Sequence, residues 1–217
     1  MSMGARLQPS EHSDLPWRIN DFVGDFELID AWALPASGTR EEFADLCEII
    51  ALLDPGDDRG SAASRKLSAV RAWLGGRMGW DAREVVNQLP IPGCTESSLS
   101  DRLPPDLAAT GGRTSEHSNF RAVFEVDDEA AFEVSNSLVH AILHLGWAHQ
   151  PGGTFRAQMG VYVKHRGPVG TLYMTAIAPF RHRVIYPALL RRIGAAWATR
   201  TTLSMRTSQA NSSETRT

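Results

Sequence analysis

Cysteine is scarce in this chain of 217 residues, and its two cysteines, Cys47 and Cys94, have neither CxxC nor CxxxC spacing. A disulfide-stapled scaffold and a cysteine-based zinc site are therefore excluded. An excess of one charge is also missing, because 22 Lys and Arg stand against 25 Asp and Glu, for a formal net charge of -3. This balance excludes a strongly basic nucleic-acid binder, so no nucleic-acid partner is expected.

Long apolar runs are missing too. The longest, residues 138–147, is interrupted by His140 and His144 and is far shorter than the about 20 residues that span a bilayer. The N-terminal residues contain no apolar block of the kind found in secretory signals. We therefore expect a cytoplasmic protein with no membrane span. GxSxG, Walker and GxGxxG motifs do not occur, and no cofactor is expected.

The composition that is present predicts a globular domain with a real core, since 42% of the residues are hydrophobic and 22% are charged. Both ends are polar, and the last residues contain no aromatic side chain. This predicts a flexible tail over residues 1–20 and a disordered tail over residues 200–217. A single domain is predicted between them, over residues 21–199.

Apolar periodicity predicts the order of elements in that domain. A strand over residues 26–32 is followed by two helical segments and by an irregular connection; these are expected over residues 39–53, 64–78 and 87–119. Alternating strands separated by hairpin-like loops follow, over residues 120–126, 130–134, 138–147, 155–164 and 169–178. A long helix begins after Pro179. This order predicts an α+β fold in which a curved antiparallel sheet wraps around the C-terminal helix.

Three stretches of the sequence resemble a known family: SNSLVHAILHLGW, GGTFRAQMGVYVK and GPVGTLYMTAIAPFRHRVIYPALLRRIG. They resemble a bacterial domain-of-unknown-function family within the helix-grip (START-like, SRPBCC) superfamily. That superfamily includes START lipid-transfer domains, polyketide cyclases and birch-pollen-allergen-like proteins. The resemblance covers about residues 25–199, and its firmest pattern is Gly170, Tyr173, Pro179, His182 and Tyr186. It implies an apolar cavity between sheet and C-terminal helix, and it does not specify a reaction.

His140 and His144 are the sharpest local feature. In a helix they would share one face and could both bind a metal, but the residue after His140 is Ala rather than the Glu of a zincin. In a strand, which the hairpin spacing favours, they point to one side about 13 Å apart, too far for one metal ion. No metal site is therefore expected. The two histidines are either hydrogen-bonded structural residues, or one of them lines the cavity as a general acid-base.

Apolar residues facing the expected cavity follow from strand alternation and from the helical stripe. Methionine adapts to varied ligands, and small residues leave space under the helix, although filling the core is the commoner role of both. The predicted apolar ligand-binding residues are Ile142, Met159, Met174, Ala176, Ile185 and Leu189.

Polar residues at the predicted cavity have two interpretations each. His182 lies in a basic cluster at the start of the last helix, where it could help to receive an anionic head group or simply be solvated. Trp80 and Asp81 could line the entrance, with Asp81 as an acid-base partner, or Asp81 could cap a helix. Tyr173 could assist His140 or His144 in catalysis.

Three functions remain open at this point. The first is binding of a hydrophobic small molecule, lipid or polyketide-like, in the cavity. The second is a cyclase or hydratase of secondary metabolism that uses the same cavity and a histidine. The third is an interaction domain with a filled core, and a homodimer is also left open.

Overall fold

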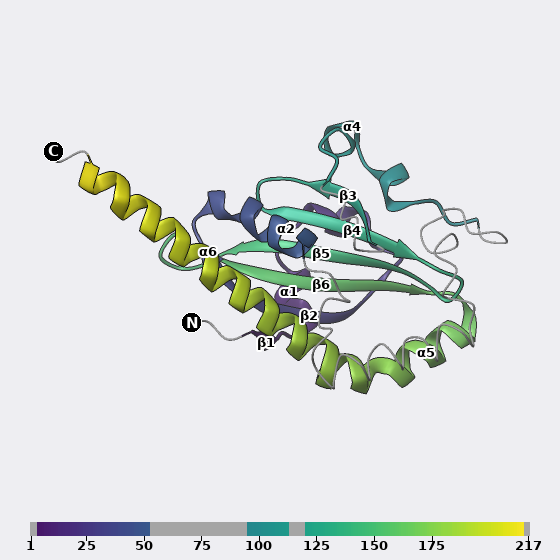
Figure 1. Cartoon of the computed structure of the whole chain (residues 1–217). Helices are drawn as coiled ribbons and strands as arrows, with labels where there is room; N and C mark the ends of the chain where they lie inside the picture. The colour runs from purple at the N-terminus through teal and green to yellow at the C-terminus, as the bar shows by residue number, and fades with distance from the viewer. Residues whose placement is uncertain (1–3, 53–94, 113–119, 215–217) are drawn as a thin grey trace.

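The computed structural model describes residues 4–52, 95–112 and 120–214, with side chains up to residue 200, and its centre is a six-stranded antiparallel sheet (Figure 1). The strands in spatial order are β1 (Ala5–Arg6), β2 (Glu27–Gly38), β6 (Phe155–His165), β5 (Val139–His149), β4 (Glu129–Ser135) and β3 (Arg121–Glu125). β3 to β6 form the predicted meander. β2, the first long strand of the chain, pairs with β6 on the side away from β5.

Two long helices follow the sheet in the chain, α5 (Gly167–Phe180) and α6 (Tyr186–Glu214), joined by a π-helical turn, η4 (Arg181–Ile185). Figure 1 shows α6 crossing in front of the sheet and continuing beyond its edge. The shorter helical segments are α1 (Pro9–Ser13), η1 (Arg18–Asp21), η2 (Arg40–Glu42), α2 (Phe43–Leu52), η3 (Leu99–Arg102) and α4 (Pro105–Ala108). The predicted α+β class, with an antiparallel sheet and a long C-terminal helix, is thus confirmed.

Each face of the sheet has its own core. On the first face, here called the α6 face, the sheet packs against α2 and α6, and the core includes Trp32, Leu145, Trp147, Met159, Ile193 and Trp197. On the opposite face, here called the outer face, residues from the N-terminal segment, η3 and α4 complete a core that includes Trp17, Ile19, Leu99, Phe124, Ile142 and Tyr162. Strand alternation explains the division, because successive side chains point to opposite faces.

Residues 138–147 were predicted as a strand, and β5 confirms this. In β5, His140 pairs with Ser135 and Lys164, and His144 pairs with Ala131 and Gly160. The helical alternative, and the metal ligation that it would allow, are excluded for this segment.

Residues 169–178 were predicted as a strand, and this is wrong because they lie in α5. β6 already has β5 on one side and β2 on the other, so the segment that follows it has no free edge of β6 with which to pair. Pro168 lies in the first turn of α5, where its missing N–H costs nothing. Gly170 lets the helix approach the sheet, since a Cβ there would overlap the carbonyl oxygen of Leu138.

Both chain ends also differ from the predicted tails. β1, α1 and η1 lie within the first 21 residues, and His12 and Ile19 are fully buried. α6 continues to Glu214, through most of the segment for which a disordered tail was predicted. The predicted helix over residues 64–78 lies outside the described residues. No helix in the described part of the chain is long and apolar enough to cross a membrane.

Candidate functional site

Asp30 is a buried acid on the α6 face of the sheet. β2 has an irregularity between Leu28 and Asp30, where Leu28 pairs with Tyr162 but Asp30 pairs with Val161. Because Tyr162 belongs to the outer core, this shift turns the Asp30 side chain toward the α6 face. Its side chain is 0% exposed. A buried carboxylate is costly unless charged and hydrogen-bonding partners surround it.

Those partners come from η4, from the start of α6 and from β1. The His182 Nε2 atom lies 2.5 Å from Oδ1 of Asp30, and the Tyr186 hydroxyl donates to Oδ2 over 2.8 Å. Arg181 donates to the same Oδ2 from Nε at 3.2 Å and from Nη2 at 3.0 Å. Arg6 of β1 adds a longer contact, with Nη2 3.6 Å from Oδ1. We call Asp30 with Arg6, Arg181, His182 and Tyr186 the Asp30 cluster.

The π-helical turn explains how adjacent residues reach one carboxylate. Pro179 and Pro187 flank η4, and each lacks the N–H that an α-helix would bond to the carbonyl four residues earlier. Between them the helix widens, and the Tyr186 N–H bonds to the Arg181 carbonyl five residues back. Such π-helical turns occur often at functional sites. The widened turn presents Arg181, His182 and Tyr186 to Asp30 together.

Burial and charge shape the electrostatics of the Asp30 cluster. Burial raises the pKa of the Tyr186 hydroxyl, and the adjacent Asp30 carboxylate raises it further, so Tyr186 stays a hydrogen-bond donor. Two guanidinium groups, those of Arg6 and Arg181, face one carboxylate, which leaves an excess of positive charge. Arg181 is largely buried and also donates to the Met174 carbonyl, so it is held in place.

Apolar side chains adjoin the Asp30 cluster. A cross-strand row runs from Asp30 through Val161 and Leu143 to Phe132, all on the α6 face. Val161 and Leu143 are only partly buried. The next row holds Trp32, whose ring centroid lies 5.0 Å from that of Tyr186. The Trp32 indole N–H is buried and has no hydrogen-bond acceptor among the described residues.

His140 and His144 lie on the outer face, away from α6. They share this face with Ile142, whereas Leu143, Leu145 and Trp147 of the same strand face α6. Both histidines are completely buried. The alternative in which one of them lines a cavity beneath the C-terminal helix is therefore wrong, because α6 packs against the odd-numbered side chains of β5.

Each of these histidines contacts a buried glutamate. The His140 Nε2 atom is 2.6 Å from Glu133, and the His144 Nε2 atom is 3.2 Å from Glu129. Burial raises the pKa of Glu133, but hydrogen bonds, beginning with that from His140, outweigh it and lower the pKa to about 2. Burial lowers the pKa of His144 more than Glu129 raises it. These carboxylates fix both imidazole rings in the outer core.

A third histidine, His12 of α1, joins this network. Its Nε2 atom is 2.9 Å from Nδ1 of His144, and its Nδ1 atom is 2.9 Å from the Gln158 side chain. Gly160 makes room for the ring, since a Cβ there would lie 2.5 Å from the His12 Nε2 atom. Burial and the neighbouring His144 lower the pKa of His12 to about 3. The sequence pattern does not single out His12, because nothing local distinguishes it from a residue in a polar tail.

A family model described as "Protein of unknown function (DUF2867)" matches residues 22–188, which is more than half of the chain and contains Asp30, Arg181, His182 and Tyr186. The chain belongs to the DUF2867 family. No curated protein and no solved structure matches this DUF2867 chain.

The other predicted site residues of this DUF2867 domain are scattered. Met159 is buried in the core of the α6 face, Ile185 and Leu189 are partly buried, and Ile142 lies on the outer face. Ala176 is exposed on α5, so its predicted place under the C-terminal helix is wrong. Trp80 and Asp81 lie outside the described residues.

Two of the predicted site residues, Met174 and Tyr173 of α5, lie near Arg181 of the Asp30 cluster. The Met174 carbonyl accepts from Arg181, and burial raises the pKa of Tyr173 to about 12. Asp30 itself was not among the predicted site residues, although a lone acid within the apolar run of residues 28–34 is a sequence signal for a buried functional carboxyl group.

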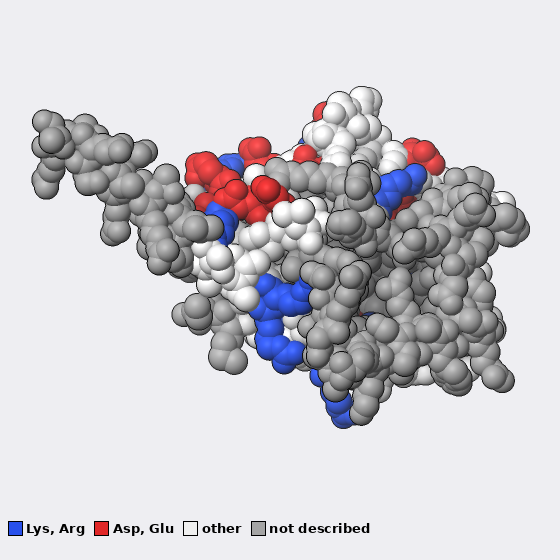
Figure 2. Space-filling model, viewed as in Figure 1, with Lys and Arg blue, Asp and Glu red and all other residues white. Residues whose placement is uncertain are grey.

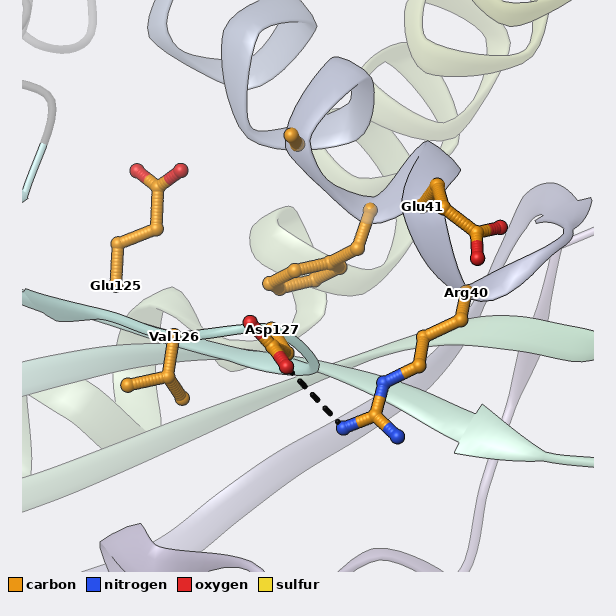
Figure 3. Close-up of a pocket in the computed structure, with 7 residues that line it drawn as sticks. Arg40, Glu41, Glu125, Val126 and Asp127 are labelled. Atoms are coloured by element: carbon orange, nitrogen blue, oxygen red, sulfur yellow. Dashed lines mark hydrogen bonds and ion pairs between the residues drawn. The ribbon is translucent and has the colours of Figure 1, made fainter.

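An open pocket of about 440 Å³ lies elsewhere on the DUF2867 domain, between the start of α2 and the β3–β4 turn (Figure 3). Charged residues dominate its lining, which consists of Arg40, Glu41, Phe43, Ala44, Glu125, Val126 and Asp127. The Arg40–Asp127 ion pair stands at its edge, with 3.3 Å between the charged atoms. Figure 2 shows acidic side chains gathered around α2 and basic side chains along α6. This pocket lacks the apolar wall that the sequence predicts for a ligand cavity.

Proposed function

We propose that this DUF2867 domain binds a hydrophobic small molecule, lipid or polyketide-like, between the α6 face of the sheet and the C-terminal helix. The polar end of the molecule lies at the Asp30 cluster. The observation that carries this proposal is a convergent set of buried polar groups at one end of an otherwise apolar face. Small-molecule sites commonly combine an apolar wall with a few placed polar groups.

The apolar wall is the row next to Asp30. Val161 and Leu143 retain partial exposure, whereas Trp32, Met159 and Leu145 in the adjacent row are buried. Partly exposed apolar side chains are ordinary when scattered, but here they continue one cross-strand row that begins at a buried acid. A ligand that covers Val161 and Leu143 would complete the burial of this row.

The polar end supplies hydrogen-bond donors. The Trp32 indole N–H has no acceptor among the described residues, and leaving such a buried donor unpaired costs about 1 to 3 kcal/mol. Arg6 has a side chain that is 55% exposed, and its contact with Asp30 over 3.6 Å leaves it donors that no other described residue accepts from. These groups suit a neutral or anionic oxygen, such as a carbonyl or a carboxylate, at the polar end of the ligand.

The fold supports the same function. A six-stranded antiparallel sheet with a long C-terminal helix is compatible with a helix-grip, START-like fold, to which we assign the domain within the SRPBCC superfamily. Proteins of this superfamily commonly hold apolar ligands between sheet and helix. Within this fold, the Asp30 cluster supplies the specific polar groups at which the ligand would bind.

Ligand binding can be tested with protein purified from cells. Native mass spectrometry should show a hydrophobic molecule that copurifies and leaves on denaturation. After its removal, an environment-sensitive apolar dye should bind with micromolar affinity and be displaced by a fatty acid.

Val161→Phe should fill the wall and weaken dye binding at least tenfold. Val169→Phe is the matched control, because Val169 lies on α5 with 59% exposure and should leave dye affinity unchanged. Equal dye binding by wild type and Val161→Phe, or no dye binding by the wild type, would contradict the proposal.

A further inference from the structure

We propose that the Asp30 cluster also performs proton transfer, with His182 as the general base and Asp30 as the residue that orients it. The substrate class is an apolar molecule with an acidic C–H next to a carbonyl group. This inference rests on the proposed function, because the substrate must lie beside Asp30 for His182 to reach it.

The hydrogen bond between His182 and Asp30 decides which ring nitrogen can act as the base. Arg181 donates to Asp30 from two nitrogen atoms, as a guanidinium does to a carboxylate. An ionised carboxylate only accepts hydrogen bonds, so the His182 Nε2 atom carries the proton. In a neutral ring, Nδ1 then carries the lone pair. Fixing the tautomer of an imidazole with a carboxylate is how an enzyme prepares a histidine base.

His182 is also reachable, unlike the histidines of the outer core. Its side chain is 26% exposed, and Nδ1 makes no hydrogen bond to any described residue. His140 and His144 have side chains that are 1% and 0% exposed. Of these three histidines, His182 is the one with an accessible, unoccupied nitrogen.

Packing holds the His182 ring in one position. It stacks on Tyr186, with ring centroids 5.9 Å apart and planes inclined by 25°. Trp32 lies on the same side, with its ring centroid 6.4 Å from that of His182. The charged or titratable neighbours are Asp30 from β2, Arg6 from β1, and Arg181 and Tyr186 from the helical segment. Such packing reduces the reorganisation needed for proton transfer.

The chemical step is a proton transfer from carbon to nitrogen. The His182 Nδ1 lone pair takes the proton, and the electron pair of the broken C–H bond forms an enolate. The negative charge on the enolate oxygen develops beside Arg6 and Arg181, where the excess positive charge stabilises it. The imidazolium then returns the proton to another atom of the same molecule. No cofactor is consumed, and the product is an isomer of the substrate.

Base activity can be measured with 5-nitrobenzisoxazole, an aromatic probe that needs only a base. The base removes the single C–H of the isoxazole ring, that electron pair completes a nitrile, and the N–O bond breaks to release a coloured phenolate. The wild type should accelerate this reaction with saturation kinetics. His182→Gln, which can still donate to Asp30, should lower kcat/KM by about 100-fold or more.

The matched control is His149→Gln, since His149 is an exposed histidine at the end of β5 and should not affect the rate. Nitrogen-15 NMR of the imidazole groups provides a readout that needs no substrate. The signals of His182 should show a protonated Nε2 and an unprotonated Nδ1.

The outcomes separate the two proposals. If the wild type binds the apolar dye but His182→Gln opens the probe as fast as the wild type, the inference fails and ligand binding stands. A protonated Nδ1 in His182 would also overturn the inference. If the wild type binds neither dye nor copurified ligand, ligand binding fails, and the base has no substrate site.

Discussion

Lowering the pH should reduce the free energy of unfolding through His12 at pH values above those at which most carboxylates protonate. His12 anchors the N-terminal segment to the outer face of the sheet, between His144 and Gln158. The charged groups nearest to this arrangement are Glu129, which accepts from His144 and from the Arg18 and Ile19 N–H groups, and Asp128. Tyr162 packs nearby with its pKa raised to about 12 by burial, so it stays neutral. Protonation of His12 therefore adds a buried charge that no carboxylate in the described part of the chain contacts directly.

The direction and magnitude of this pH effect on stability follow from the difference between the His12 pKa in the folded and unfolded states. Burial lowers the pKa of His12 from 6.5 in the unfolded chain to about 3 in the folded protein. Its contribution to stability is complete above pH 6.5 and is lost as the pH falls toward 3, because only the unfolded chain binds the proton there. At pH 5 the difference of 1.5 pH units from 6.5 corresponds to a loss of about 2 kcal/mol. His144, whose pKa is also lowered by burial, adds to this loss.

The assay is urea unfolding at pH 8 and at pH 5, for wild type, His12→Gln and the control His149→Gln. The wild type and the control should lose at least about 2 kcal/mol between the two pH values. His12→Gln should start less stable at pH 8, but its loss between pH 8 and pH 5 should be smaller by about 2 kcal/mol. An equal pH dependence in His12→Gln and wild type would refute the reasoning.

Three further predictions concern single contacts. Asp30→Asn should lower the free energy of unfolding by about 3 to 5 kcal/mol, because it leaves the buried Arg181 guanidinium without its counter-charge. Thermal or urea unfolding measures this loss. The control Glu27→Gln, at an exposed position, should change the free energy of unfolding by less than about 0.5 kcal/mol. Gly160→Ala should cost about 1 to 3 kcal/mol and reduce the pH dependence just described, since its Cβ would displace the His12 ring. Gly170→Ala should destabilise the packing of α5, so that hydrogen exchange becomes faster in α5 and in the β4–β5 hairpin. Gly24→Ala should have no effect on exchange there, because no atom lies within 4 Å of the added Cβ.

The sequence predicted the sheet better than the site. Alternation in β6 correctly assigned Met159 to the face that the C-terminal helix covers, because period 2 is a local property of the chain. The same alternation misassigned α5, since strand and helix are hard to tell apart in a short apolar segment and the occupied edges of β6 decide the matter. Which face of β5 the C-terminal helix covers was not predictable, as it depends on contacts between distant segments. His182 was singled out as a ligand residue, but its partner Asp30 lies 152 residues away.

The buried acids of the two faces bind different kinds of groups. This difference distinguishes acids that stabilise the fold from an acid with a functional role. On the outer face, Glu129 accepts from the backbone N–H groups of Arg18 and Ile19, and Glu133 accepts from that of Leu99. An acid that binds the backbone of a covering segment fixes that segment, and its burial needs no further explanation. Asp30 makes no such bond among the described residues; all its contacts are to side chains, one of them a partly exposed imidazole. Fixing side-chain orientation rather than backbone is what a site for a small molecule requires, so Asp30 is the acid to which we assign a function.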